Sequence, residues 1–307
     1  MQNCVNSKDI LVDNVQNNAN SLEFSYKNKN LLSAREVLKN MKNRNFTENG
    51  RIKIGFSGLD KIIKGFKKSN FVVIGSKTSV GKSAFALNIV NNLCQQNRSV
   101  GFFSLEVSNK SIAARLMAMN SEVESYKICN NILMDDNERL RCDKAFSKIK
   151  NFKMRVDDTC DIDIHELKSK ARKMKKDYGV EIIFIDRIDL ISTLHNNIPR
   201  FEEIADLSRN IRALTLELEI PIIVLCPLYW YDEDREPSLA DLAEMESLEQ
   251  DADMVILLHR ENEEQQDNEE EVRKIKVIVA KNRCGAIGTA TIGFEPKYTK
   301  FMDVGVG

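Results

Sequence analysis

The chain has 307 residues, 42% of them apolar and 30% charged, which is ordinary for a globular protein and excludes a fibrous or largely disordered one. Its formal net charge is −1, so any contact with a nucleic acid must come from a local basic patch and not from a global positive field. The 7 cysteines are odd in number and never spaced Cys-x-x-Cys, which argues against both a disulfide framework and a zinc site. Cysteines scattered in this way favour a protein that resides in a reducing compartment. Since the sequence shows neither a signal peptide nor an apolar run of membrane-spanning length, we expect a cytoplasmic protein without membrane contact.

The beginning of the chain differs in composition from the rest. Residues 1–30 are rich in Asn and Ser and poor in aromatic side chains, so their burial cannot offset the entropy of ordering, and we expect a mostly disordered N-terminal tail. Residues 31–49 are predicted to form a linker helix and a connector, because the apolar positions from 31 to 42 follow helical spacing. The apolar stripe of this helix needs a partner, either its own domain or a neighbouring copy. Residues 50–307 would then form one globular domain.

A strand, a turn and a helix are predicted over residues 71–84, FVVIGSKTSVGKSA, which is the setting that a phosphate-binding loop requires. The loop pattern is Gly, four residues, then Gly-Lys-Ser/Thr, and Gly81, Lys82 and Ser83 fill its second half. Ser76 occupies the first glycine position. Lys82 would reach the β- and γ-phosphates of ATP and Ser83 would ligate Mg²⁺, whereas the alternative is an ordinary Gly-Ser turn before a helix. The nucleotide-binding residues expected in this stretch are Ser76, Ser79, Gly81, Lys82, Ser83 and Ala84.

Strand-like and helical runs alternate through most of the remaining sequence. Strands are expected at 71–74, 100–105, 181–186, 221–226 and 254–259, and helices at 83–96, 109–120, 137–150, 164–178 and 201–218. Residues 261–271 are acidic and are predicted to form a solvated hairpin tip, followed by alternating antiparallel strands at 273–280 and 289–294. The pattern predicts an α/β fold whose mainly parallel central sheet has helices on both faces and antiparallel C-terminal strands.

Two acidic residues end predicted strands, where ligands bind in such sheets. Asp186 ends EIIFID, the form of a Walker B strand, and is expected to bind Mg²⁺ together with Ser83 and so to contribute to the nucleotide site. Glu106 follows the second strand and is positioned to polarise an attacking water. A loop-initiating aspartate and an unremarkable glutamate after a strand are the alternatives.

With these residues in place, the chain resembles the motor domain of DnaB-type replicative helicases over about residues 31–307. The motifs that carry the resemblance are SGLD (57–60), the phosphate-binding loop, FFSLEVS (102–108), VDDT (156–159), IIFID (182–186), IPIIVL (220–225), LEQDAD (248–253) and AKNRCGAIGT (280–289). The resemblance implies a RecA-like P-loop NTPase fold, a homo-hexameric ring, and 5′-to-3′ unwinding on single-stranded DNA that depends on ATP and Mg²⁺. It also implies that Lys82 and Glu106 are catalytic, and that Lys281 and Arg283 act on the γ-phosphate held by the neighbouring subunit. The alternative for the last two is an exposed strand end that is basic.

The chain departs from its relatives in several places. The helical N-terminal domain of the family is absent or reduced to residues 1–30, which argues against a primase contact, whereas a helicase loader is a possible partner. Cys226 and Pro227 replace a Ser-Gln pair whose glutamine contacts the γ-phosphate, and proline offers no side-chain hydrogen bond. Residues 241–246, DLAEME, replace Asp-Leu-Arg-Glu-Ser-Gly, so Ala243 stands in place of a phosphate-binding arginine and Glu246 adds negative charge. The remaining departures are Arg187 and Asp189, in place of Tyr and Gln, and the aromatic run Tyr229, Trp230 and Tyr231, which would stack on bases or pack in an interface.

Three functional hypotheses follow from these patterns. The first is an active ring helicase driven by ATP. Its basis is that the positions of the family's nucleotide site are filled by matching residues, namely Lys82, Ser83, Glu106, Asp186, Lys281 and Arg283. The second is a helicase-like regulatory or assembly subunit that binds ATP without unwinding DNA, because the departures fall in the segments that couple nucleotide to DNA. The third is a recombinase or clock-type RecA-like ATPase, which shares the phosphate-binding loop but not LEQDAD and AKNRCG.

Overall fold

The computed structural model describes residues 33–35, 38, 50–130, 132–192, 199–228, 235–260 and 272–304. Contacts divide the chain into two units, Met1–Asn49 and Gly50–Gly307. The tail predicted at 1–30 lies outside the described residues. In the predicted linker segment Ala34, Arg35 and Leu38 are helical and exposed, and the role of that segment as a linker stays a prediction.

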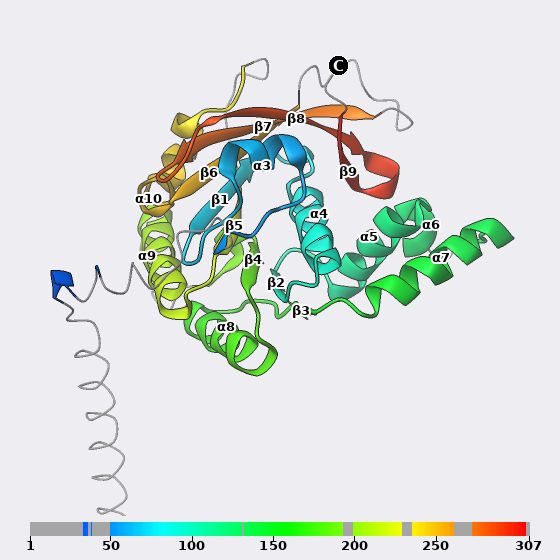
Figure 1. Cartoon of the computed structure of the whole chain (residues 1–307), viewed down its shortest axis with the longest axis horizontal. Helices are drawn as coiled ribbons and strands as arrows, with labels where there is room; N and C mark the ends of the chain where they lie inside the picture. Colours follow the sequence, from blue (N-terminus) through cyan, green and yellow to red (C-terminus); the bar gives the residue numbers. More distant parts are fainter. Residues whose placement is uncertain are drawn as a thin grey trace, which may run out of the picture. The chain divides into compact units, whose positions relative to one another are not determined.

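A nine-stranded sheet in the described part of the second unit has the strand order β3-β2-β4-β5-β1-β6-β7-β8-β9 (Figure 1). Neighbours from β3 to β6 pair in parallel, and β6 to β9 pair antiparallel. The strands are β1 (Phe71–Ser76), β2 (Val100–Ser104), β3 (Met154–Asp157), β4 (Ile182–Asp186), β5 (Ile222–Pro227), β6 (Met254–Arg260), β7 (Arg273–Asn282), β8 (Gly288–Glu295) and β9 (Lys300–Asp303). The predicted α/β class, with its parallel sheet and antiparallel C-terminal strands, is confirmed. The acidic segment 261–271, predicted as a hairpin tip, lies outside the described residues.

The helices lie between the strands, as the alternating pattern predicts. They are α3 (Ser57–Ile63), α4 (Lys82–Gln95), α5 (Asn109–Ser121), α6 (Ser125–Cys129), α7 (Asp136–Ile149), α8 (Ile164–Tyr178), α9 (Arg200–Leu218) and α10 (Glu246–Asp251), with 3-10 turns η2 (Ile188–Leu190), η3 (Leu239–Met245) and η5 (Pro296–Tyr298). Side-chain caps fix some helix starts: Asp163 accepts hydrogen bonds from two amides at the start of α8, and Asp135 forms a capping box with Glu138 at α7. None of the described helices has the length and apolar character needed to cross a membrane.

Both faces of the sheet are buried because the side chains of each strand alternate between two hydrophobic cores. On β1, Val72 and Ile74 belong to the core that contains α4 and α5, and Phe71 and Val73 belong to the core that contains α8 and α9. Figure 1 shows α4 and α5 on one side of the strands and α8 and α9 on the other. Every residue of β1 is buried, so the segment that leads into the phosphate-binding loop is fixed on both sides.

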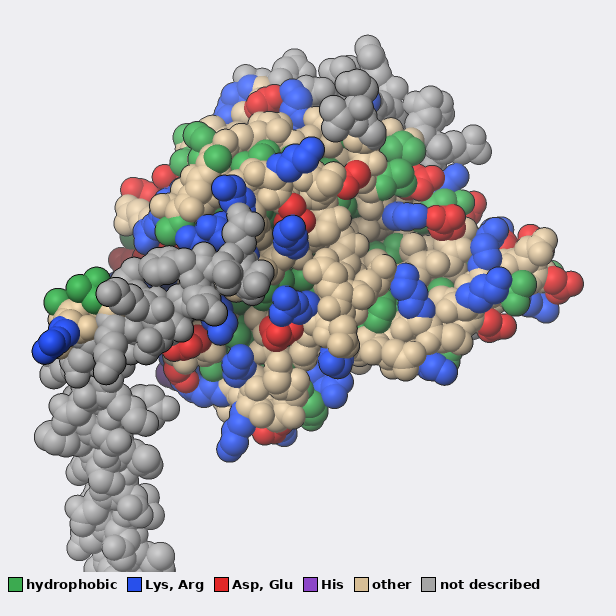
Figure 2. Space-filling model, viewed as in Figure 1, with side chains coloured by type: hydrophobic (Ala, Val, Ile, Leu, Met, Phe, Trp, Pro, Cys, Tyr) green, Lys and Arg blue, Asp and Glu red, His purple; other side chains and the backbone are tan. Residues whose placement is uncertain are grey.

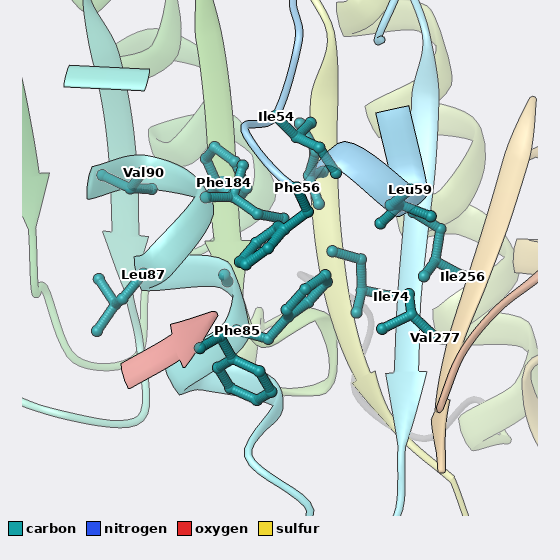
Figure 3. Packing of buried hydrophobic residues seen from close by; sticks show 14 of the residues in the cluster. Ile54, Phe56, Leu59, Ile74, Phe85, Leu87, Val90, Phe184, Ile256 and Val277 are labelled. Carbon is teal, nitrogen blue, oxygen red and sulfur yellow. The ribbon is translucent and has the colours of Figure 1, made fainter. Parts of the chain in front are cut away.

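Aromatic side chains join α4 to the C-terminal strands, and Figure 3 shows one of them, Phe85, beside Phe56. Phe85 on α4 is fully buried, stacks on Phe56 with ring centroids 5.5 Å apart, and meets the edge of Phe301 on β9 at 5.4 Å. Asn88, one turn further along α4, donates to the carbonyl of Thr299 at 2.9 Å and accepts from the amide of Phe301 at 2.9 Å. The last strand is therefore attached to the helix that begins at the phosphate-binding loop.

Phe85→Ala is expected to lower the free energy of unfolding by about 3–5 kcal/mol, because it empties a fully buried ring site between α4 and β9. Urea denaturation followed by circular dichroism measures the change. Phe146→Ala on α7 is the matched control, since this ring is 62% exposed and its loss should change stability by no more than about 0.5 kcal/mol. Equal effects of the two substitutions would contradict the packing described.

Candidate nucleotide-binding site

The loop between β1 and α4 has the backbone geometry of an anion cradle. Gly81 is the N-cap of α4 and has φ 101°, a left-handed conformation, and Ser79 has φ 66°. A Cβ atom on Gly81 would lie 3.3 Å from the ring of Phe301, so the space behind the loop is already filled. The amides at the start of α4 together with the positive end of its dipole favour a bound phosphate. Ser76 is fully buried, and its hydroxyl donates to the carbonyl of Lys77 at 2.8 Å, so its side chain stabilises the turn.

Lys82, Ser83 and Asp186 lie close together at the carboxyl end of the parallel strands. Lys82 and Ser83 are the first two residues of α4, and Asp186 ends β4 with no exposed surface. Burial raises the pKa of Asp186, while the Ser83 hydroxyl and the charge of Lys82 oppose that shift. In the described part of the chain, neither carboxylate oxygen of Asp186 meets a hydrogen-bond donor with acceptable geometry. A buried carboxylate without partners beside a serine hydroxyl is a donor set that fits Mg²⁺.

Glu106 lies beside this group and is held by an arginine. The amide of Leu105 donates to the carbonyl of Asp186 at 2.7 Å, which fixes the end of β2 against the end of β4. The Glu106 carboxylate accepts from Arg187 Nη1 at 3.3 Å. Arg187 in turn binds both oxygens of Asp189, at 2.8 and 2.7 Å. The sequence identified Arg187 and Asp189 as departures from the family, but it did not indicate that they pair with each other.

Lys281 and Arg283 lie at the opposite edge of the sheet from the phosphate-binding loop. Lys281 pairs with Val255 near the start of β6, and the amide of Arg283 donates to the carbonyl of Asp253 at 2.8 Å. Arg283 is level with the start of β1, so roughly 17 Å of strand separates it from the loop. Lys281 is level with Val73, which leaves roughly 10 Å, and each distance exceeds the reach of the side chain concerned. The predicted site residues thus form two groups, and these two are not brought to the others within one chain.

The side chains of Lys281 and Arg283 are tied to α10 and reach the surface. Lys281 Nζ donates to the carbonyls of Glu249 and Gln250, and Arg283 donates to the carbonyl of Gln250. Arg283 is 45% exposed, so its guanidinium is accessible to a neighbouring molecule. Desolvation lowers the pKa of Lys281, and the nearby charge of Arg283 adds to this effect.

The departures in the coupling segments lie partly on described residues. Pro227 ends β5 in register with Ser76, and burial raises the pKa of the preceding Cys226 thiol to about 12. Glu246 is exposed at the start of α10 and accepts from Gln250 at 3.0 Å. The aromatic run 229–231 and the side chain of Ala243 lie outside the described residues. On the face shown in Figure 2 the visible Lys and Arg side chains are interspersed with Asp and Glu.

One basic residue near the site was missed by the sequence analysis. Arg115, on α5, carries a charge that lowers the pKa of Asp186. Its helix begins soon after Glu106, and the capping Ser108 accepts from the amide of Ser111. The only sequence signal for Arg115 is that it lies in the first helix after Glu106. Other basic residues on helices share such a position, so the signal does not single out Arg115.

A glycine-centred loop between a buried strand and a helix, with acidic residues at the ends of adjacent parallel strands, defines a P-loop NTPase of the RecA-like class. Residues 51–303 match the family model described as "DnaB-like helicase C terminal domain", so the chain belongs to this family. It is 33% identical over 258 residues to "Replicative DNA helicase DnaB" of Geobacillus stearothermophilus, and the match covers 82% of this chain and 56% of that protein. The chain spans about half the length of the curated relatives it matches.

Solved structures agree with this assignment. A solved structure described as an ATPase domain superposes with a TM-score of 0.81 at 29% identity and covers 89% of this chain and 99% of that one. The structure titled "The Structure Of A DnaB-Like Replicative Helicase And Its Interactions With Primase" superposes with a TM-score of 0.80 at 26% identity and covers 97% of this chain and 74% of that one. The resemblance to DnaB-type helicases that the motifs indicated is confirmed. The family match favours it over the recombinase or clock-type ATPase.

Asp186→Asn is expected to stabilise the nucleotide-free protein by about 1–2 kcal/mol, because it removes a fully buried charge that the neighbouring Ser83 hydroxyl only partly offsets. The same substitution should abolish most of the further stabilisation that Mg²⁺ and a nucleotide give together. Urea unfolding with and without Mg²⁺ and ADP measures both effects. Asp253→Asn is the control, because Asp253 is bonded to Arg212 and to the amide of Phe71, and its loss should destabilise. Destabilisation by both variants would contradict the analysis of Asp186.

Proposed function

We propose that this chain is the motor domain of a ring-forming DNA helicase that binds and hydrolyses ATP and acts on single-stranded DNA. The observation that carries the proposal is the separation of the site residues onto opposite edges of one sheet, with the phosphate-binding loop at one edge and Lys281 and Arg283 at the other. A head-to-tail ring, such as a homo-hexamer, places one edge of each subunit against the opposite edge of the next. Family membership supports the same assembly.

The residues of the loop edge are proposed to bind and position the triphosphate. The backbone amides from Ser79 to Ala84 would hold the β-phosphate, and Lys82, only 8% exposed, would place its ammonium against the β- and γ-phosphates. Ser76 shapes the start of the loop. Ser83 and Asp186 would hold Mg²⁺, which when bound neutralises charge on the phosphate oxygens. Glu106 would accept a hydrogen bond from the attacking water and orient it toward the γ-phosphate.

The opposite edge is proposed to complete the site of the neighbouring subunit. Charge develops on the γ-phosphate oxygens during hydrolysis, and a cation placed there in advance stabilises that charge. Lys281 and Arg283 are pre-oriented for this role because backbone carbonyls of α10 hold both side chains. Hydrolysis would then depend on assembly, since a single subunit leaves the developing charge uncompensated.

Lys82→Ala and Arg283→Ala are each expected to reduce ATP turnover by roughly 100-fold or more, because one removes a phosphate contact and the other the trans cation. Mixing the two inactive variants should restore activity. In randomly mixed rings, about a quarter of the interfaces combine an intact loop of one variant with the intact Arg283 of the other. Turnover in the mixture should therefore approach about a quarter of the wild-type value. A phosphate-release assay measures the turnover, and Lys82→Ala mixed with Lys82→Ala is the control. No recovery in the mixture of the two variants would refute the trans arrangement.

A second candidate function is a regulatory or assembly subunit that binds ATP but does not unwind DNA. Pro227, at the loop edge of the sheet, carries no side-chain donor, and the exposed Glu246 adds negative charge in the segment where relatives bind the DNA backbone. A DNA affinity that falls steeply with salt would favour the motor, and negligible DNA affinity at moderate salt would favour the subunit. A contact with a helicase loader stays a prediction for either function, and so does the expectation that a primase contact is lacking.

Pro227→Gln is expected to raise the turnover measured with single-stranded DNA by about two-fold or more and to leave DNA-free turnover within about two-fold of wild type, since it restores a hydrogen-bonding side chain beside the loop. ATPase assays with and without DNA measure the ratio. Pro221→Gln, at the other end of the same strand segment, is the matched control and should not change it. An unchanged ratio in both variants would show that Pro227 does not limit coupling.

A further inference from the structure

Arg187 and Asp189, which depart from the family pattern just after Asp186, form an ion pair with each other. The guanidinium of Arg187 places Nε and Nη2 on the two oxygens of Asp189, at 2.8 and 2.7 Å, and Nη1 on Glu106 at 3.3 Å. A bidentate arginine–carboxylate pair has fixed geometry, so Asp189 determines where the guanidinium lies. The third contact then falls on the residue to which we assign activation of water.

The side chains of Arg187 and Asp189 are more buried than the side chain of Glu106. The side chains of Arg187 and Asp189 are 19% and 15% exposed, whereas that of Glu106 is 41% exposed. Asp189 lies in η2, and its carbonyl accepts a hydrogen bond from Arg200 at the start of α9, which ties the pair to a long helix. Glu106 has a single, longer contact with the guanidinium. Arg187 is therefore the more firmly held partner, and Glu106 is the side chain with more freedom to turn.

We propose that Arg187 is a positioning residue that restrains Glu106 in the nucleotide-free protein and lowers basal ATP hydrolysis until Glu106 turns to the attacking water. The proposal rests on the proposed function, in which Glu106 orients that water. The contact with Arg187 holds the Glu106 side chain in one orientation, and Glu106 must break it to turn toward a water at the γ-phosphate, so the two contacts compete. Because the ion pair is partly exposed, it changes the population of the restrained state by roughly five-fold at most. The restraint thus persists for part of the time when ATP is bound, and it lowers kcat without abolishing hydrolysis.

Arg187→Gln and Asp189→Asn are both expected to raise the basal turnover number, Arg187→Gln more than Asp189→Asn. Arg187→Gln removes the restraint and should raise kcat about two- to five-fold, with KM for ATP changed by less than about two-fold. Asp189→Asn removes the charged partner that fixes the guanidinium, loosens its contact with Glu106, and should raise kcat by about two-fold. A merely structural ion pair would give losses in both variants. Two losses, or no change, would overturn the proposal.

The matched control is a second bidentate pair, Arg172 with Glu217, at 2.6 and 2.9 Å between α8 and α9. Arg172→Gln and Glu217→Gln should leave kcat within about two-fold of wild type. Arg187→Lys keeps the charge without the fork and should fall between wild type and Arg187→Gln. In a Glu106→Gln background, single-turnover hydrolysis should not respond to Arg187→Gln, because the residue acts through Glu106.

A double-mutant cycle on urea unfolding separates the failure of this inference from that of the proposed function. Arg187→Gln, Glu106→Gln and the double variant, measured without nucleotide, should give unfolding constants coupled by about two- to five-fold. No coupling would overturn the Arg187–Glu106 contact whether or not the wild type hydrolyses ATP. Coupling in a wild type that hydrolyses no ATP would overturn the proposed function and the restraint together.

Discussion

The buried carboxylate of Asp186 is the group on which the architecture of the site depends. Its side chain has no exposed surface and neither oxygen has a donor of acceptable geometry in the described residues, so its charge is disfavoured by desolvation. The fold tolerates this because β4 lies between β2 and β5 and is covered by a hydrophobic core on each face. Stability is supplied by the apolar strands, and the polar group is available for a ligand. Loss of stability in exchange for a polar group that can bind a ligand is common at functional sites.

The sheet acts as a rigid spacer between two chemically different edges. The parallel strands place Lys82, Ser83 and Asp186 at one edge and leave Lys281 and Arg283 at the other. All residues of β1 are buried on both sides, so the distance between the edges is fixed by a strand that cannot bend without disturbing two cores. A geometry of this kind cannot bring both groups to one nucleotide within a single chain.

The sequence predicted those parts of the molecule that depend on local pattern. The buried strands and long helices follow from periodicity, and Asp186 and Glu106 follow from their positions at strand ends. The strand β3 was missed because it lies at the sheet edge with only half-buried or exposed side chains, and β9 because it has only four residues. The contact between Glu106 and Arg187 could not be predicted, because these residues are 81 positions apart and meet only through the pairing of β2 with β4. The importance of Lys281 and Arg283 came from the family resemblance, since their own pattern indicates no more than a basic strand end.

The attachment of β9 to α4 affects the order in which the protein can form. The amide of Phe301 donates to Asn88, which lies 213 residues earlier in the chain, and the ring of Phe301 packs behind Gly81. Contacts of such large sequence separation form late in folding, because the intervening chain must be ordered first. During synthesis, the helix that carries Lys82 emerges from the ribosome long before the strand that covers it. A nascent chain therefore carries the Phe85 ring of α4 without its β9 partner until residue 301 has left the ribosome, and in that interval it offers chaperones a hydrophobic surface to recognise.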